Sequence, residues 1–169
     1  MGSSGLSFGV PATNDPQASY KLQMAAALAR IKPSASWFDW IAILSVVNGA
    51  IALGNGNWNF LLGLGVTTVL NAYARAGQIS PTLSLAVTVV VAAFFWLMGR
   101  FAKSGQKWAL ILGMALYALD GILIVPYELW LMIAFHVYAL IMLARAFGAI
   151  SALVAVKADA QAHGVFVDQ

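Results

Sequence analysis

Five long hydrophobic segments decide in which solvent this sequence can fold. They are Trp37–Leu53, Trp58–Tyr73, Leu83–Gly99, Trp108–Val125 and Leu129–Phe147. Each is close to the length of about 17 to 25 residues that spans a bilayer. Backbone amides in lipid must be satisfied within the segment, and runs this long without regular alternation do not form barrel strands. The sequence therefore predicts an all-α integral membrane protein, a compact bundle of five hydrophobic helices.

Composition supports lipid as the solvent. Of the 169 residues, 62% are hydrophobic and 9% are charged, with a mean hydropathy of +0.84. About a quarter of an average soluble domain is charged, so too few polar residues are present to cover a water-exposed surface. The net charge of +3 does not indicate nucleic-acid binding, because the basic residues lie between hydrophobic runs rather than in clusters. The absence of cysteine excludes disulfides and thiolate metal sites.

The flanking regions divide the chain into four parts. Residues 1–16 are rich in Gly, Ser and Pro and predict a flexible tail. Residues 17–33 predict an amphipathic helix that ends at Pro33 and either lies at the membrane interface or packs on the protein. The bundle is expected over residues 34–157, followed by a polar tail over residues 158–169.

Charge distribution bears on how many segments cross. If all five cross, the basic residues divide four against five between the two sides. If Trp58–Tyr73 returns without crossing, Arg75 lies alone on the outer side and the other eight share the cytoplasm. The second arrangement satisfies the positive-inside rule, so four full spans with a re-entrant second segment are favoured over five.

Polar residues inside the spans are the candidates for function. Asp120 and His136 lie on either side of the Tyr127–Glu128 turn, and both are about 11 to 13 Å from the same end of their helices. An ionised carboxylate at this depth should find a partner, so we expect a buried Asp120–His136 pair, with Gly113 allowing the helices to approach.

Further polar residues extend this prediction. In the four-span topology Asn48 lies at the same depth, and together with Tyr117 it completes a candidate buried polar cluster with Asp120 and His136. A second candidate is the polar stripe Thr67, Asn71 and Arg75, which either lines a cavity or packs against a neighbouring helix. The cluster itself is either interhelical glue or a proton or ligand site.

Missing motifs argue against an enzyme. There is no G-x-S-x-G motif, no second membrane aspartate to pair with Asp120 and no phosphate-binding glycine loop. No cluster of His, Asp and Glu has metal-ligand spacing, and only His136 among the two histidines lies in a span, so we expect no metal, haem or other cofactor.

Several short patterns resemble those of a family of small, uncharacterised bacterial multi-pass membrane proteins. They are Gly113-x-x-x-Tyr117-x-Leu119-Asp120-Gly121, Phe135-His136-x-x-x-Leu140, Leu44-Ser45-x-x-Asn48 and Gly63-Leu64-Gly65. The resemblance covers most of the chain from Trp37 to Phe147. It implies a bacterial membrane location and carries no activity with it.

Two functions remain open from the sequence. The first is a structural or accessory subunit of a membrane assembly, and the second is a small oligomeric transporter or channel in which Asp120 and His136 form a proton-responsive pair. The expected partners are the lipid bilayer and other membrane subunits or further copies of the chain, and not nucleic acid. The expected location is the bacterial inner membrane, with a cytoplasmic N-terminus.

Overall fold

The protein is an all-α membrane bundle. The structure, a computed structural model, describes residues 15–54 and 63–165. Its helices are α1 (Pro16–Ala35), α2 (Trp37–Leu53), α3 (Gly65–Arg75), α4 (Pro81–Lys103), α5 (Lys107–Leu123), the 3-10 turn η1 (Val125–Tyr127), α6 (Trp130–Ala144) and α7 (Ala146–Ala162). No strand occurs in the described ranges. The helical fold class predicted from the hydrophobic segments is confirmed.

Within the described residues, four helical stretches are long and apolar enough to cross a membrane. They are Pro16–Leu53, Pro81–Lys103, Lys107–Tyr127 and Trp130–Ala162. Helix α3 is not among them, because its 11 residues reach only about 16 Å against a hydrocarbon core of about 30 Å. The part of the second predicted segment from Trp58 to residue 62 lies outside the described residues. In the described part of the chain, four stretches of spanning length agree with the predicted four spans, and α3 is too short to be a further one.

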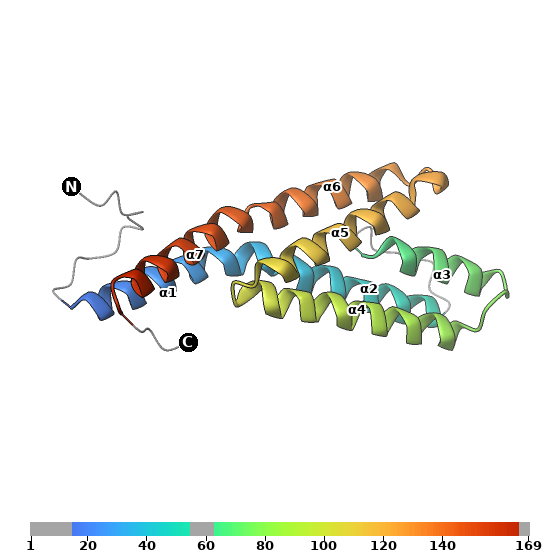
Figure 1. Ribbon diagram of the computed structural model, residues 1–169. Coiled ribbons are helices and arrows are strands. Elements are labelled where there is room, and N and C mark those ends of the chain that lie inside the picture. The colour runs from blue at the N-terminus through green and yellow to red at the C-terminus, as the bar shows by residue number, and fades with distance from the viewer. Residues whose placement is uncertain (1–14, 55–62, 166–169) are drawn as a thin grey trace.

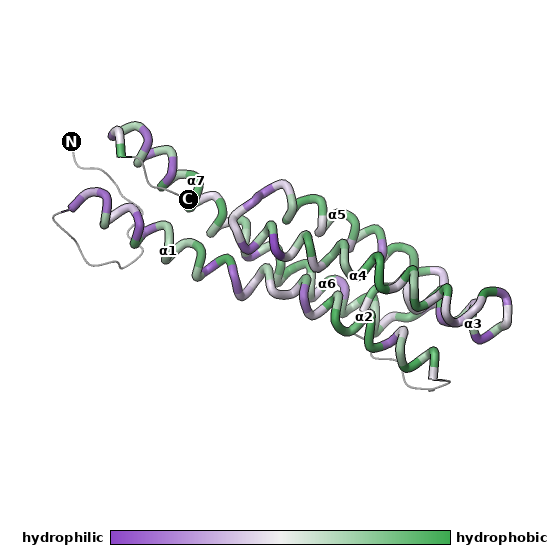
Figure 2. Tube along the Cα trace, turned by 90° about the horizontal axis from the view of Figure 1, so that it is seen from below, coloured by the Kyte–Doolittle hydropathy of each residue, from purple (hydrophilic) through white to green (hydrophobic). Residues whose placement is uncertain are grey.

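The helices form an elongated bundle with two different ends (Figure 1). Helix α3, the start of α4 and the η1 turn lie at one end, while the α4–α5 connection lies toward the other. Helices α1 and α7 run side by side past that connection, so the described chain begins and ends at this end of the bundle (Figure 1). Hydrophobic residues fill the middle of the bundle and hydrophilic residues gather toward both ends, as Figure 2 shows.

Helix α1 packs on the protein, which was one of the two alternatives from the sequence. Its Ala27, Ile31 and Ala35 are fully buried, and Tyr20 Oη donates a hydrogen bond of 2.7 Å to Asp159 Oδ2 of α7. The prediction that Pro33 ends the helix is wrong, because α1 continues to Ala35. A proline inside a helix removes one amide donor and bends the axis, and here the chain resumes as α2 after a single turn residue.

The first helix and the last helix also have other bounds than the sequence predicts. Asp15 caps the first helix through a bond of 2.9 Å from the Gln17 amide to its Oδ1, and the helix starts at Pro16. Helix α7 ends at Ala162, so the polar tail predicted from residue 158 begins within a helix. Residues 1–14 and 166–169 of the two predicted tails lie outside the described residues.

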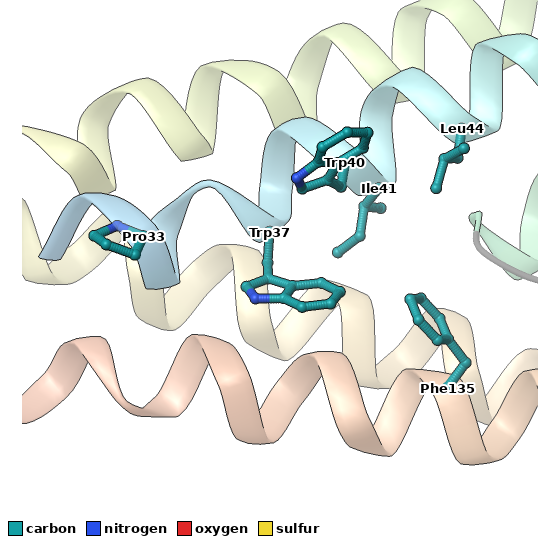
Figure 3. Close-up of a pocket in the computed structure, with 6 residues that line it drawn as sticks. All are labelled: Pro33, Trp37, Trp40, Ile41, Leu44 and Phe135. Atoms are coloured by element: carbon teal, nitrogen blue, oxygen red, sulfur yellow. The ribbon is translucent and has the colours of Figure 1, made fainter.

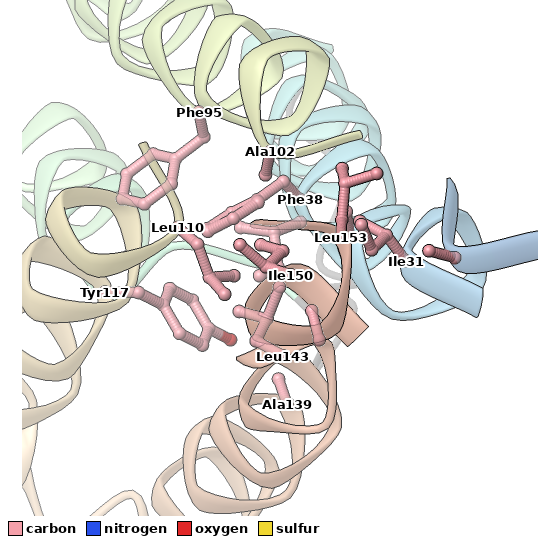
Figure 4. Packing of buried hydrophobic residues seen from close by; sticks show 14 of the residues in the cluster. Ile31, Phe38, Phe95, Ala102, Leu110, Tyr117, Ala139, Leu143, Ile150 and Leu153 are labelled. Atoms are coloured by element: carbon pink, nitrogen blue, oxygen red, sulfur yellow. The ribbon is translucent and has the colours of Figure 1, made fainter. Parts of the chain in front are cut away.

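The core of the bundle is aromatic at its centre (Figure 4). The side chains of Phe38, Leu110 and Tyr117 are fully buried, and the ring of Phe95 packs edge-on to that of Tyr117 with centroids 6.1 Å apart. The expectation that Gly113 brings the α5–α6 hairpin together is wrong. An added Cβ at Gly113 would lie 2.5 Å from Phe38 Cζ of α2, so this glycine makes room for the core and not for α6.

This close approach predicts the effect of a single methyl group. Gly113→Ala should lower the free energy of unfolding in detergent by about 1 to 3 kcal/mol, because the Phe38 ring is enclosed and cannot move without displacing the core. Gly148→Ala is the matched control, since a Cβ there meets no atom within 4 Å and gains helix propensity. Equal thermal unfolding temperatures for the two variants would contradict this account of the core.

Candidate functional site

The structure brings Asp120 and His136 together. His136 Nε2 of α6 lies 3.0 Å from Asp120 Oδ2 of α5, and only 3% and 8% of the two side chains are exposed. The α5–α6 hairpin places both residues at one depth, as the spacing around its turn predicts. Gly121, next to Asp120, allows the close approach, because an added Cβ there would lie 3.1 Å from His136 Cδ2.

Asp120 has two further partners, both on the backbone of α3. The amide of Gly65 donates to Oδ2 at 2.5 Å and the amide of Val66 donates to Oδ1 at 2.8 Å. Both amides belong to the first turn of α3, where no intrahelical acceptor exists. The N-cap residue Leu64 offers no side-chain oxygen. A carboxylate from another helix therefore caps α3.

Helix α2 completes the cap. Ser45 Oγ accepts a hydrogen bond of 2.8 Å from the Leu64 amide and donates one of 2.7 Å to the carbonyl oxygen of Ile41. Side chains of α2 and α5 thus accept hydrogen bonds from three consecutive amides, those of Leu64, Gly65 and Val66. In lipid an unsatisfied amide costs several kcal/mol, so this set of acceptors is what allows a helix to begin inside the bundle.

Glycines make this docking sterically possible. A Cβ at Gly65 would lie 2.5 Å from Ile124 Cγ2 and 2.8 Å from the carbonyl oxygen of Asp120. A Cβ at Gly63 would lie 2.9 Å from Asn48 Nδ2. Asn48 is therefore buried against the chain that enters α3, and it borders the same helix start as Asp120. The Gly63-Leu64-Gly65 stretch is a docking element, since any larger side chain at position 65 would push α3 away from α5.

His136 lies between two hydrogen-bond acceptors. Its Nδ1 lies 2.9 Å from the carbonyl oxygen of Met132. A carbonyl only accepts, so Nδ1 carries a hydrogen and donates it. The contact with Asp120 then needs a second proton, either on Nε2 or on the carboxyl group, and with that proton the pair has no net charge. The carboxylate also accepts from the two first-turn amides of α3, at the positive end of that helix.

Tyr117 is the fourth member of the predicted cluster. Its ring stacks on the imidazole of His136, with centroids 4.4 Å apart and planes inclined by 14°. Its hydroxyl is buried and has no hydrogen-bond partner among the described residues. The Tyr117 ring covers one face of the buried imidazole. Tyr117 therefore acts on the pair through its ring.

The second predicted site, the polar stripe, is divided among different contacts. Thr67 is buried, and its Oγ1 donates a hydrogen bond of 2.7 Å to the carbonyl oxygen of Leu64 at the start of the same helix. Asn71 Oδ1 accepts a hydrogen bond of 2.9 Å from Ser84 Oγ of α4. Asn71 and Arg75 also line a cavity of about 30 Å³. Asn71 therefore both contacts a neighbouring helix and borders a small cavity.

Neither Asp120 nor His136 lines any of three pockets found in the described part of the chain. Within the described ranges, no three His, Asp or Glu side chains gather as a metal site would require. The cluster is a closed set of hydrogen bonds between α2, α3, α5 and α6. Its chemistry, as built, is to hold those helices together.

Comparisons with family models, with curated proteins and with solved structures find no match for this chain. The resemblance to small bacterial membrane proteins stays a prediction.

Sequence reasoning identified the side chains of the site but not the backbone they bind. It missed the amides of Gly65 and Val66 and the carbonyl oxygen of Met132 as partners. One signal was present: a glycine pair opens a segment that begins without Ser, Thr, Asp or Asn at its cap. A helix start of that kind needs its cap from elsewhere in the protein.

The paired geometry predicts strong coupling in a double-mutant cycle. Asp120→Asn and His136→Gln should each lower the free energy of unfolding in detergent, with an interaction energy of about 0.5 to 3 kcal/mol, because each change leaves the other group with a lost partner. The matched control is the Asp159–His163 pair. Its side chains are 60% and 66% exposed, and 3.6 Å separates Asp159 Oδ1 from His163 Nδ1. Its cycle should show little coupling, and additive losses at both pairs would contradict the site.

The cap on α3 makes a separate prediction for hydrogen exchange. In Asp120→Ala, amides of Gly65–Arg75 should exchange about tenfold faster, because two first-turn donors lose their acceptor. His136→Gln is the control, since it leaves the carboxylate in place for those amides. Exchange in α3 should change less in this variant. Unaltered α3 exchange in Asp120→Ala would show that the carboxylate does not hold the helix.

Proposed function

We propose that this chain is a structural or accessory subunit of a membrane assembly and not an enzyme. The observation that carries the proposal is the use of Asp120: both carboxylate oxygens are engaged, by the Gly65 and Val66 amides and by His136. A transport or catalytic group must be open to a ligand at some stage. Here the ionisable pair is enclosed and its hydrogen bonds hold a short helix in place.

The outer surface supports a role in helix association. Many large apolar side chains are exposed along the spanning helices, and Val90 and Trp130 are 69% and 67% exposed. Such a surface meets lipid or the helices of other subunits, including further copies of this chain. Trp130 begins α6 at the end of the bundle where α3 lies, so a partner helix there would contact the same end that Asp120 organises.

The charge distribution supports a bacterial inner-membrane orientation with both ends of the described chain in the cytoplasm. With α3 not crossing, Arg75 lies alone at one end, and the remaining eight basic residues lie toward the end where α1 and α7 meet. Cytoplasmic loops carry the excess of Lys and Arg in membrane proteins. We therefore assign the α1–α7 end to the cytoplasm.

One observation favours the alternative, a small oligomeric transporter or channel. The Asp120–His136 pair holds a proton that either group is able to carry, as a proton relay requires. A relay would also need an exit from the enclosed pair. The two functions therefore differ in whether the pair exchanges its proton across the membrane.

Reconstituted vesicles test this difference. A pH gradient imposed across proteoliposomes and followed with an internal pH-sensitive dye should decay at the rate of protein-free vesicles. The matched uncharged variant Asp120→Asn with His136→Gln should behave identically. Gradient decay that Asp120→Asn abolishes, in a protein that remains folded, would overturn the structural proposal in favour of transport.

Association is tested in the native membrane. A photo-reactive side chain at position 130, which is exposed, should give a cross-linked product of discrete mass. The same side chain at position 154, on the exposed face of α7 at the opposite end, is the control for random collision. Identical diffuse products at both positions would contradict a defined partner at the α6 end.

A further inference from the structure

A small cavity lies at the end of the bundle where α3 meets α2 and α4. Its volume is about 30 Å³. It is lined by Ala52 and Leu53 of α2, Asn71, Ala74 and Arg75 of α3, and Pro81 and Ser84 of α4. The end of α2, the end of α3 and the start of α4 thus surround one space. Helix ends carry backbone groups that have no partner within their own helix, so this is a polar part of the bundle.

One polar atom of the lining side chains lacks a partner. Asn71 is only 3% exposed, and its side-chain amide has one oxygen that accepts and one nitrogen with two hydrogens to donate. Ser84 Oγ donates to the oxygen at 2.9 Å. The nitrogen, Nδ2, is buried and has no hydrogen-bond partner among the described residues. Buried donors in native structures rarely stay unpaired, so Nδ2 calls for an acceptor from outside the chain.

The size and the chemistry of the cavity restrict what that acceptor is. A volume of about 30 Å³ exceeds the roughly 10 to 15 Å³ that one water molecule needs. It is far below the roughly 300 Å³ of the smallest pockets for organic ligands. A metal cation does not fit, because the unpaired group of Asn71 is a donor and not a ligand. A water molecule and a small anion are the remaining occupants.

A second partner at the cavity favours water over an anion. Ser84 spends its hydrogen on Asn71 Oδ1, and a hydroxyl oxygen that donates is still able to accept. Ala52 and Leu53 belong to the last turn of α2, where the carbonyl oxygens point toward the helix end. A water molecule is able to donate to these oxygens, whereas an anion would be repelled by them. Buried waters make two to four hydrogen bonds, and Asn71 Nδ2 with Ser84 Oγ supplies the first two.

We propose that this cavity binds one water molecule, which accepts a hydrogen bond from Asn71 Nδ2 and donates one to Ser84 Oγ. Asn71 follows Gly65 by six residues, or about 9 Å along α3. The Asp120 carboxylate holds the start of that helix, and the water holds its second half against α4. A bridging water is nearly as favourable as a direct hydrogen bond. The inference does not depend on the function proposed above.

The apolar slot in Figure 3 is the matched dry site. It has a volume of about 220 Å³ and is lined by Pro33, Trp37, Trp40, Ile41, Leu44 and Phe135. The rings of Trp37 and Phe135 flank the space that faces Ile41 (Figure 3). No side-chain nitrogen or oxygen of these six residues is buried without a partner. Cavities lined by apolar groups stay dry, so bound water is expected beside Asn71 and not beside Leu44.

Nuclear magnetic resonance of the full chain in detergent micelles tests the proposal. The side-chain amide hydrogens of Asn71 should show cross-relaxation with a bound water, and the methyl hydrogens of Leu44 should show none. Gln78, which is exposed in the turn after α3, reports that contact with bulk water is detected. An Asn71 amide without a water signal, in a spectrum where Gln78 shows one, would overturn the proposal.

Filling the cavity should remove the water. Ala74 lines the cavity, so Ala74→Leu occupies the space while Asn71 and Ser84 remain in place. The water signal of Asn71 should then be lost. Ala72→Leu is the matched control, because Ala72 is an exposed residue of α3 outside the lining. It should keep the signal. Ala74→Val is the smaller filling if the leucine variant does not fold. An unchanged signal in a folded variant at position 74 would contradict the cavity as the site.

Exchange of chloride for gluconate separates a water molecule from an anion. A bound water should leave the side-chain amide shifts of Asn71 the same in both salts, because gluconate is too large for a cavity of about 30 Å³ and water is present in each. Amide shifts of Asn71 that change and saturate with chloride concentration would overturn the proposal and assign the cavity to an anion.

Discussion

The Asp120 carboxylate is the group on which the rest of this bundle depends. A lone carboxylate inside a bilayer is unfavourable by several kcal/mol, and so is a helix start with unpaired amides. Here the two groups satisfy each other. The Asp120 carboxylate accepts hydrogen bonds from the Gly65 and Val66 amides, and α3 is therefore able to begin inside the protein. His136 supplies the remaining donor, so the group of contacts carries no net charge.

Docking α3 in this way sets the topology. Because α3 is too short to cross by itself, four stretches of the described chain are long enough to span a membrane, and both ends of the described chain lie at one end of the bundle. That arrangement allows α1 and α7 to pair past the α4–α5 turn, and it brings Arg30 and Arg145 to opposite walls of one groove. With five crossings these two arginines would lie on opposite sides of the membrane.

Much of this architecture was predictable from the sequence. Segment length predicts which helices are able to span the bilayer, and the distribution of basic residues predicts their orientation. Depth counted from the turn also brought Asp120 and His136 together. The glycine pair before α3 indicated a helix start that needs a cap from elsewhere, but the sequence does not say which group supplies it, because every residue except proline has an amide that a carboxylate could accept from. Gly113 was assigned to the wrong neighbour for a related reason: depth along a helix is readable from the sequence, but the packing of helices around its axis is not.

The two candidate functions differ in whether the Asp120 carboxylate ever releases its hydrogen-bond donors. Moving a proton through Asp120 would require the carboxylate to exchange donors, and the donors it holds are the first amides of α3 and the imidazole of His136. Beneath that imidazole lies the Tyr117 ring, and behind it the Met132 carbonyl oxygen, neither of which offers a proton path out of the site. Proton transfer would therefore undock α3, and with it the contact of Ser45 with Leu64. A subunit whose task is to hold helices in place keeps these contacts throughout, whereas a transporter would have to break and remake them in every cycle.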